Sequence, residues 1–173
     1  MIAGGDVTLR PWDRGDTVFV FDSCRDPDIQ RWTKVPRPYT ALDAATFIDR
    51  HARAQPEDDS AFFAITRTDS GELLGSISYN TIDWAFRRAE VGYWVAPDAR
   101  RQGVALAAVE ALVMWGGTAL GLVEVRLLAA RGNVASQGVA TRAGFTMTEV
   151  QPGACQDGDG PADGFVFARH LGR

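Results

Sequence analysis

The sequence predicts an α+β fold, and two observations carry this prediction. The longest helical stretch, residues 104–120, has a wide apolar face and a single charged residue, Glu110, so this helix must be largely buried. Strand-like segments precede it in quick succession, and their short connections are typical of an antiparallel meander. Other strands follow the helix. The strands are expected at 61–67, 73–82, 89–95, 123–129, 145–150 and 165–169.

The N-terminal part contributes a further strand and two helices. Residues 6–12 alternate apolar and polar side chains, which predicts a strand. Residues 16–24 predict a short helix, and Thr40 is a suitable cap for a helix from Ala41 to about Gln55. Between these helices, residues 27–39 are expected to be irregular because they contain three prolines.

The C-terminal part contains one more helix and gives no sign of a domain boundary. Residues 133–143 predict a short helix that ends at Gly144, a residue suited to a left-handed cap. The chain has 173 residues, with no internal repeat and no linker-like segment. A single domain spanning residues 1–173 is therefore expected.

Composition excludes several classes of protein. The chain is 46% hydrophobic and 23% charged, which is typical of a globular domain. Its net charge of −4 argues against a binder of duplex nucleic acid. No segment reaches the ~18 consecutive apolar residues of a membrane span. Two cysteines and two histidines make a zinc site or a disulfide framework improbable. We expect a cytoplasmic, metal-free protein without a nucleic-acid or membrane partner.

The segment that joins a strand to the long helix contains a candidate anion site. A helix N-terminus leaves about four N–H groups without partners and carries roughly half a positive charge. Arg100 and Arg101 are unfavourable at such a position unless an anion is bound there. Gly103 removes the side chain where a backbone must approach a ligand closely. The segment predicts a phosphate or pyrophosphate site; the alternative is two solvated arginines at an ordinary helix start.

Several motifs in order resemble the GNAT superfamily of acyl-CoA-dependent N-acetyltransferases. The loop before the long helix is similar to that family's Arg/Gln-x-x-Gly-x-Gly/Ala pyrophosphate motif, and Asn133-x-x-Ser136 with the following Gly144-Phe145 is similar to its next motif. The run from Glu90 to Phe145 is most similar to the RimJ/RimL-like branch, which acetylates protein N-termini and small amines. The resemblance implies a three-layer fold with helices on both faces of a mixed, mostly antiparallel sheet, splayed at the cofactor site.

The resemblance also implies acetyl-CoA as the acyl donor, with no metal. Its pantetheine arm would insert between the strand that ends at Val95 and the parallel strand 123–129, where unpaired backbone groups could bind it. The residues assigned to the cofactor in this way are Trp94, Val95, Ala96, Arg100, Arg101, Gln102, Gly103, Val104, Ala105, Asn133 and Ser136.

The implied chemistry is direct acetyl transfer to a primary amine. A base must remove a proton from the amine, and Glu90, on the strand that leads to the cofactor, is the candidate. The alternative is that Arg87 or Arg88 neutralises this carboxylate. A backbone N–H of Val95 or Ala96 is the expected donor to the oxyanion.

A coenzyme A thiolate is a fairly good leaving group, so an acid that protonates it is not a strict requirement of the reaction. Many members of the family have a tyrosine four residues after the position of Ser136, but here that residue is Ala140. In the RimL-like branch the serine is the proposed substitute, so Ser136 is assigned this role. The alternative for Ser136 is ordinary hydrogen bonding in the first helical turn.

Three aromatic residues are candidates for the acceptor pocket, because loop aromatics supply apolar walls and cation–π contacts to an amine. They are Trp32, Tyr39 and Trp84; the alternative for each is packing over the core.

The expected acceptor is a peptide or protein N-terminus or an amine-bearing small molecule. A non-catalytic acyl-CoA-binding or regulatory module is the alternative function. Strand edges near the C-terminus would also allow a homodimer.

Overall fold

A computed structural model describes residues 1–52, 59–158 and 160–172. Within these residues, eight strands form one sheet in the order β1-β2-β3-β4-β5-β6-β8-β7. Every neighbouring pair is antiparallel except β5 and β6, which are parallel. The strands are β1 (Ile2–Gly4), β2 (Val7–Arg10), β3 (Ala61–Arg67), β4 (Leu73–Asp83), β5 (Arg88–Val95), β6 (Glu124–Ala130), β7 (Thr146–Asp157) and β8 (Gly160–His170).

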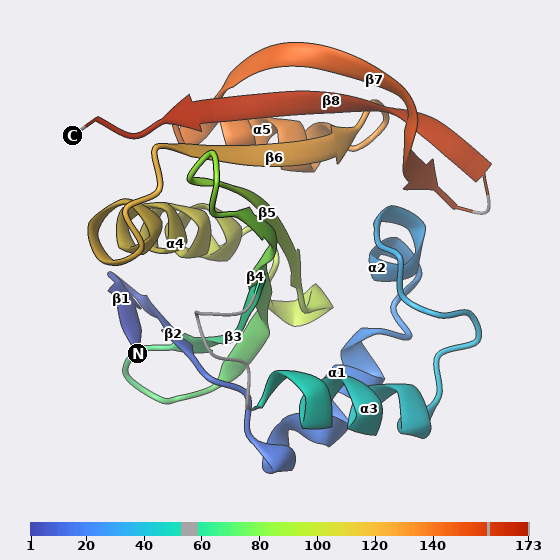
Figure 1. Ribbon diagram of the computed structural model, residues 1–173. Coiled ribbons are helices and arrows are strands. Elements are labelled where there is room, and N and C mark those ends of the chain that lie inside the picture. The colour runs from blue at the N-terminus through green and yellow to red at the C-terminus, as the bar shows by residue number, and fades with distance from the viewer. Residues whose placement is uncertain (53–58, 159, 173) are drawn as a thin grey trace.

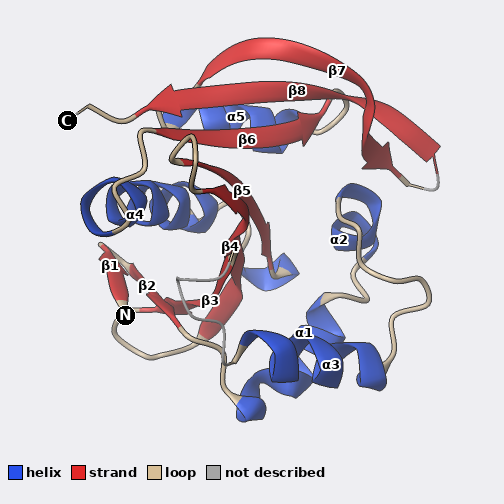
Figure 2. Cartoon of the chain, in the orientation of Figure 1, coloured by secondary structure: helices blue, strands red, loops and turns tan. Residues whose placement is uncertain are grey.

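Helices cover both faces of this sheet (Figures 1 and 2). Helix α4 lies against one face together with α5, whereas α1 and α3 lie on the other. The predicted three-layer α+β fold is therefore confirmed. No helix in the described part of the chain combines the length and apolar character needed to cross a membrane. The helices are α1 (Thr17–Ser23), α2 (Pro27–Trp32), α3 (Ala41–His51), α4 (Val104–Ala119) and α5 (Val134–Arg142).

The larger core lies between α4 and the sheet, as the apolar sequence of this helix predicts. Leu112 of α4 is fully buried, and its carbonyl accepts a hydrogen bond of 2.8 Å from the hydroxyl of Tyr79 on β4. A Cβ at Gly116, one turn further along α4, would overlap the Tyr79 hydroxyl. The glycine therefore allows the helix to approach the sheet closely, which offsets its weak helix propensity.

The sheet opens between its two parallel strands. Pairing of β5 with β6 begins at Arg88 and ends at Val91, which lies opposite Leu127. Beyond that point β5 still pairs with β4 as far as Val95, and β6 still pairs with β8 as far as Ala130. Each strand thus follows its outer neighbour, and the gap between them is the splay expected at the cofactor site.

Two regions differ from the sequence predictions. Residues 27–32 form α2 rather than an irregular loop, because the Asp26 carboxylate accepts a hydrogen bond of 3.0 Å from the N–H of Ile29 and Pro27 occupies the first helical turn. Strands β7 and β8 extend through the segment expected to be a loop, with shifts in register at 147–149 and 151–155. The predicted end of α3 near Gln55 lies outside the described residues.

Candidate active site

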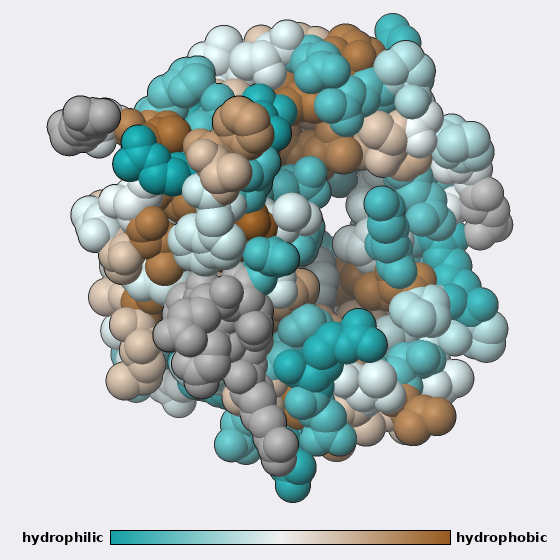
Figure 3. Space-filling model, viewed as in Figure 1, coloured by the Kyte–Doolittle hydropathy of each residue, from teal (hydrophilic) through white to brown (hydrophobic). Residues whose placement is uncertain are grey.

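A cavity of about 1220 Å³ passes through the gap between β5 and β6. In Figure 3 it is seen as an opening between β5 and α2, below β6 and β8. We distinguish two ends of this cavity. The α4–α5 end is lined by Tyr93, Val95, Arg101, Gly103, Val104, Asn133 and Ser136. The α2–β4 end is lined by Trp32, Lys34, Tyr39, Ser76, Ser78, Asn80 and Glu90.

The start of α4 has the features of an anion site. Gly103 precedes the first helical residue in the left-handed conformation, with φ of +80°, and no side chain caps the helix. No atom lies within 4 Å of the position that a Cβ on Gly103 would take. Val104 and Ala105 follow at the cavity wall, so the N–H groups of the first turn face open space. A phosphate or pyrophosphate fits this cradle.

The two neighbouring arginines have different surroundings. The Arg100 guanidinium binds the carboxylates of Asp26 and Asp28, the second at 3.0 Å, and donates to the carbonyl of Val95 at 3.2 Å. Arg100 therefore joins the loop to α2 instead of remaining available for an anion. The guanidinium of Arg101 lines the cavity and forms no hydrogen bond or ion pair with a described residue. Both arginines line the cavity, but only Arg101 has a side chain that is not engaged by described residues.

The end of β5 distinguishes the two backbone N–H groups proposed for the oxyanion. Ala96 donates its N–H to the carbonyl of Leu74 at 2.9 Å, and Ala96 does not line the cavity. Its assignment as an oxyanion donor is therefore wrong. Because hydrogen-bonded and non-hydrogen-bonded pairs alternate in an antiparallel ladder, the N–H of Val95 points away from β4, towards the gap.

Gln102 was assigned to the cofactor through its backbone N–H, whereas its side chain turns away from the cavity. Its amide nitrogen donates to the carbonyl of Asp98 at 2.8 Å, and its oxygen accepts from Arg67 of β3 at 3.2 Å. Gln102 thus stabilises the loop that precedes Gly103. Its side chain is occupied by these contacts and is not placed to bind a ligand in the cavity.

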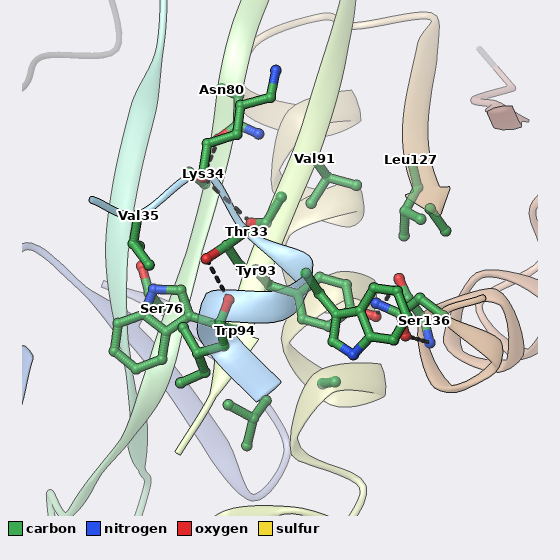
Figure 4. Close-up of a pocket in the computed structure, with 18 of the residues that line it drawn as sticks. Thr33, Lys34, Val35, Ser76, Asn80, Val91, Tyr93, Trp94, Leu127 and Ser136 are labelled. Carbon is green, nitrogen blue, oxygen red and sulfur yellow. Dashed lines mark hydrogen bonds between the residues drawn. The ribbon is translucent and has the colours of Figure 1, made fainter. Parts of the chain in front are cut away.

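The first turn of α5 brings Ser136 to the cavity. The Asn133 side chain caps this helix by accepting the N–H of Ser136 at 3.1 Å. The Tyr93 hydroxyl donates to Ser136 Oγ, also at 3.1 Å, and Figure 4 shows Tyr93 reaching from β5 to the start of α5. Burial raises the pKa of Tyr93, so its hydroxyl stays protonated at neutral pH. Ala140, one turn after Ser136, is fully buried and presents no hydroxyl.

Sequence reasoning missed Tyr93, although a signal was present. Tyr93 lies two residues before Val95 on a strand whose alternate residues, including Val91, are buried against α4. A hydroxyl in this apolar row had to find a polar partner. The identity of that partner depends on the spatial approach of α5, which no local pattern in the sequence reveals.

Glu90 lies at the cavity wall without a charged partner. Its backbone pairs with Thr81 of β4 and with Arg126 of β6. The expected alternative was neutralisation by Arg87 or Arg88, but Arg88 pairs with Asp83 at 3.2 Å. Among the described residues, the Glu90 carboxylate forms no hydrogen bond or ion pair.

A row of polar residues on β4 was also missed. Ser76, Ser78 and Asn80 occupy alternate positions on one face of the strand, and both serines are buried. Ser78 donates to the Asn80 side chain at 2.7 Å. Figure 4 shows Asn80 and Lys34 at the end of the cavity away from Ser136. Polar residues at every second position place their side chains on one face of a strand, so this pattern could have predicted a polar cavity wall.

The three aromatic residues assigned to the acceptor are not brought together. Trp32 and Tyr39 both line the cavity, and Arg31 stacks over the Trp32 ring at 4.5 Å. Trp84 is 39% exposed on the turn between β4 and β5 and does not line the cavity, so the structure does not bring it to the other two. Arg31 also pairs with Asp157 at 2.6 Å, which ties α2 to the tip of the β7–β8 hairpin.

The chain matches the family described as the acetyltransferase (GNAT) domain over residues 6–146. This protein therefore belongs to the GNAT acetyltransferases and is an acyltransferase, as the motifs predicted. It is similar to the uncharacterized N-acetyltransferase YoaA of Bacillus subtilis (strain 168), with 27% identity over 137 residues. That match covers 79% of this chain and 77% of YoaA.

Solved structures of the same fold include two with bound coenzyme A. RimL, a ribosomal L7/L12 alpha-N-protein acetyltransferase, in complex with coenzyme A, superposes with a TM-score of 0.88 at 19% identity, covering 98% of this chain and 97% of RimL. The spermidine N-acetyltransferase of Vibrio cholerae, in complex with coenzyme A and spermine, gives a TM-score of 0.82 at 19% identity, covering 95% of each chain. At these identities the likeness establishes the fold.

Proposed function

We propose that this protein is an acetyl-CoA-dependent N-acetyltransferase that moves the acetyl group directly to a primary amine. The observation that carries the proposal is the cavity itself, which passes between β5 and β6 and meets the uncapped start of α4. A long donor with an anionic end and an amide-rich arm fits such a channel. The membership of the GNAT family supports the same reaction class.

The residues at the α4–α5 end fit coenzyme A. The N–H groups that follow Gly103, together with Arg101, would hold the pyrophosphate, because they present hydrogen-bond donors and positive charge to one point. The free backbone edge of β5, including Val95, would bind the pantetheine amides. When bound, acetyl-CoA supplies an activated thioester. The protein would then have to position an amine and manage protons.

Glu90 is proposed as the base. An α-amino group has a reference pKa near 7.7–8.0 and a lysine near 10.4, so most acceptor amines arrive protonated. The Glu90 carboxylate lines the cavity and has no competing ion pair among the described residues. It can take the proton directly or through a water molecule. The N–H of Val95, directed to the gap, is proposed to stabilise the oxyanion.

The charges at the α2–β4 end favour an acceptor with a single amine over a polyamine. Asp28 and Asp43 also line the cavity, but Asp28 binds Arg100 and Asp43 accepts two hydrogen bonds from Thr40. Of these three lining carboxylates, only Glu90 lacks a described partner. A polyamine carries several ammonium groups, and each one loses its hydration on entering the cavity and needs an opposite charge there to offset that cost. A peptide N-terminus or a small primary amine, with Trp32 and Tyr39 as walls, fits better.

The proposal is tested by measuring thiol release from acetyl-CoA with a panel of amines. A short peptide with a free N-terminus and a small primary amine should release thiol, and the same peptide with a blocked N-terminus should not. Spermidine should react more slowly than the peptide. Binding of acetyl-CoA without release for any amine would instead identify a non-catalytic acyl-CoA-binding module. Displacement of bound acetyl-CoA by ATP or NAD, and not by coenzyme A, would contradict the donor assignment.

A further inference from the structure

The α4–α5 end of the cavity contains a pair of hydroxyls that the proposed reaction has not yet used in full. Tyr93 donates to Ser136 Oγ at 3.1 Å, across the gap between β5 and α5. A serine hydroxyl has one proton and two lone pairs. Because Tyr93 fills an acceptor site on Ser136, the serine's own proton remains free for a second partner, and no described residue accepts it.

The backbone fixes this arrangement from both sides. Ser136 is held in the first turn of α5 by the Asn133 cap, which accepts its N–H at 3.1 Å. Tyr93 is held in β5, which pairs with β4 through Ile77 at this level. Arg142 lies on the same helix as Ser136, and its positive charge acts to lower the pKa of Tyr93. The Arg142 side chain donates to the carbonyl of Gly138 at 3.1 Å.

We propose that Tyr93 is a positioning residue: by donating to Ser136 Oγ, it directs the Ser136 proton towards the sulfur of the departing coenzyme A. This inference rests on the proposed function. Without Tyr93, the Ser136 hydroxyl would rotate among several orientations. With it, one lone pair is occupied, so fewer orientations of the serine O–H remain, and the favoured one is proposed to face the departing sulfur.

The proton count of the transfer balances. Glu90 takes the first proton from the ammonium, and the nitrogen loses a second proton to water as the C–N bond forms. The thioester C–S bond breaks, its electron pair goes to sulfur, and the sulfur takes the Ser136 proton. The serine oxygen then recovers a proton from water in the open cavity. No oxidant or further reactant is needed, and Tyr93 keeps its proton throughout.

The test compares Tyr93→Phe, Ser136→Ala and the double variant. Ser136→Ala is expected to lower kcat about 100-fold, and Tyr93→Phe about tenfold, the effect of one lost orienting hydrogen bond. The double variant should be no slower than Ser136→Ala, because Tyr93 acts only through the serine. The Kd of acetyl-CoA, measured by calorimetry, should stay within about twofold of the wild-type value in Tyr93→Phe, because Tyr93 is not among the residues assigned to the cofactor.

A matched control is available on the neighbouring strand. Tyr79 donates its hydroxyl to the Leu112 carbonyl inside the core and does not line the cavity. Tyr79→Phe therefore removes a tyrosine hydroxyl that lies in the core and away from the cavity, and it should lower the Tm while leaving kcat unchanged. Tyr93→Phe should instead lower kcat and leave the Tm nearly unchanged.

A second readout does not depend on turnover. Hydrogen-bond donation to a thiolate favours the charged form, so it lowers the pKa of a bound thiol. The thiolate absorbance of bound coenzyme A, titrated with pH, should show a higher thiol pKa in Tyr93→Phe and in Ser136→Ala than in the wild type. Arg142 is present in every variant, so its contribution cancels.

Three results would overturn the inference. They are additive losses in the double variant, an unchanged kcat in Tyr93→Phe, and a thiol pKa that does not move. A wild-type protein that binds acetyl-CoA but transfers nothing would instead contradict the proposed function. The two failures are therefore distinguishable.

Discussion

The two ends of the cavity are built in different ways. The α4–α5 end comes from residues 93–136, where strand, loop and helix follow one another, and its proposed ligand-facing groups are mostly backbone N–H donors at helix starts. The α2–β4 end is assembled from α2, the segment up to Tyr39, β4 and the β7–β8 hairpin, which are distant in sequence. The α4–α5 end can therefore bind a ligand through backbone groups of one continuous segment. The α2–β4 end depends on side chains that the packing of distant segments brings together.

This difference suggests a division of labour. Backbone groups at a helix start recognise an anion whatever the side chains around them, so the α4–α5 end is suited to an invariant donor. Side-chain walls can change one residue at a time, so the α2–β4 end is suited to determine the acceptor. Each of the following variants breaks or sharpens this contrast.

Gly103→Glu should have the largest effect. The new side chain would occupy the open cradle, add a negative charge beside the anion site, and force a residue with a Cβ into φ of +80°. We expect the Kd of acetyl-CoA to rise about 100-fold or more, since each hydrogen bond to a charged group contributes about 1.5–3 kcal/mol. Calorimetry measures this. Gly71→Glu, at a similar φ of +74° with open surroundings on the β3–β4 turn, is the control and should bind normally.

Glu90→Gln tests whether the proposed base can be removed without affecting donor binding. The amide cannot accept a proton from the amine, so kcat should fall about 100-fold. The Kd of acetyl-CoA should stay close to the wild-type value, because Glu90 is not part of the anion site. Steady-state kinetics and calorimetry on the same preparation separate the two effects. Glu149→Gln, an exposed change on β7, is the control; an equally slow control would show that the loss at Glu90 is not specific.

Asp26→Asn tests whether the two ends communicate. An asparagine can still cap α2 through the N–H of Ile29, but it removes the charge that binds Arg100. We expect a loss of stability of about 1 kcal/mol, reduced by solvent screening, and an acceptor KM raised about threefold as α2 loosens. Asp28 is 65% exposed, so Asp28→Asn should change both quantities less. Equal effects from the two variants would show that the burial of the Asp26 pair is unimportant.

His51→Phe should have the smallest effect, visible only in acid. Burial, reinforced by Arg50, lowers the pKa of His51 to about 4, and its ring stacks on Phe62 at 3.7 Å. The unfolded chain binds a proton near the ordinary pKa of about 6.5, so the free energy of unfolding of the wild type decreases as pH falls from there towards 4. Phenylalanine keeps the stack and removes the proton. Urea titrations should give unfolding curves for the two proteins that diverge below pH ~6.5; parallel behaviour would contradict the buried neutral histidine.

The sequence predicted the α4–α5 end well, because its features are local. The apolar face of α4, the glycine at its start and the short helix that begins near Asn133 all follow from residue types at fixed spacings. Arg100 was assigned to the anion because its real partners, Asp26 and Asp28, could not be recognised from the sequence. They lie about 70 positions earlier, at the start of α2. No spacing rule links residues so far apart.

The α2–β4 end was predicted less completely. Helix α2 was missed because Pro27 was interpreted as a breaker, although Asp26 followed by proline is also a helix start. Trp84 was assigned to the pocket by residue type alone, and its turn lies outside the cavity. Tyr93 was missed because its role depends on a helix more than 40 positions later. Local patterns identified the elements but not which side chains meet.

The tie between α2 and the β7–β8 hairpin has a consequence for the order of folding. Arg31 and Asp157 are separated by 126 positions, and their pair holds the β7–β8 hairpin, whose residues 154–156 line the cavity, against α2. Contacts this distant form late, because a long loop must be ordered before they contribute. A nascent chain that has emerged only as far as α5 would already contain the anion-binding loop but would lack this wall. The last hairpin therefore completes the α2–β4 end of the cavity only after the segment that carries the start of α4 has been made.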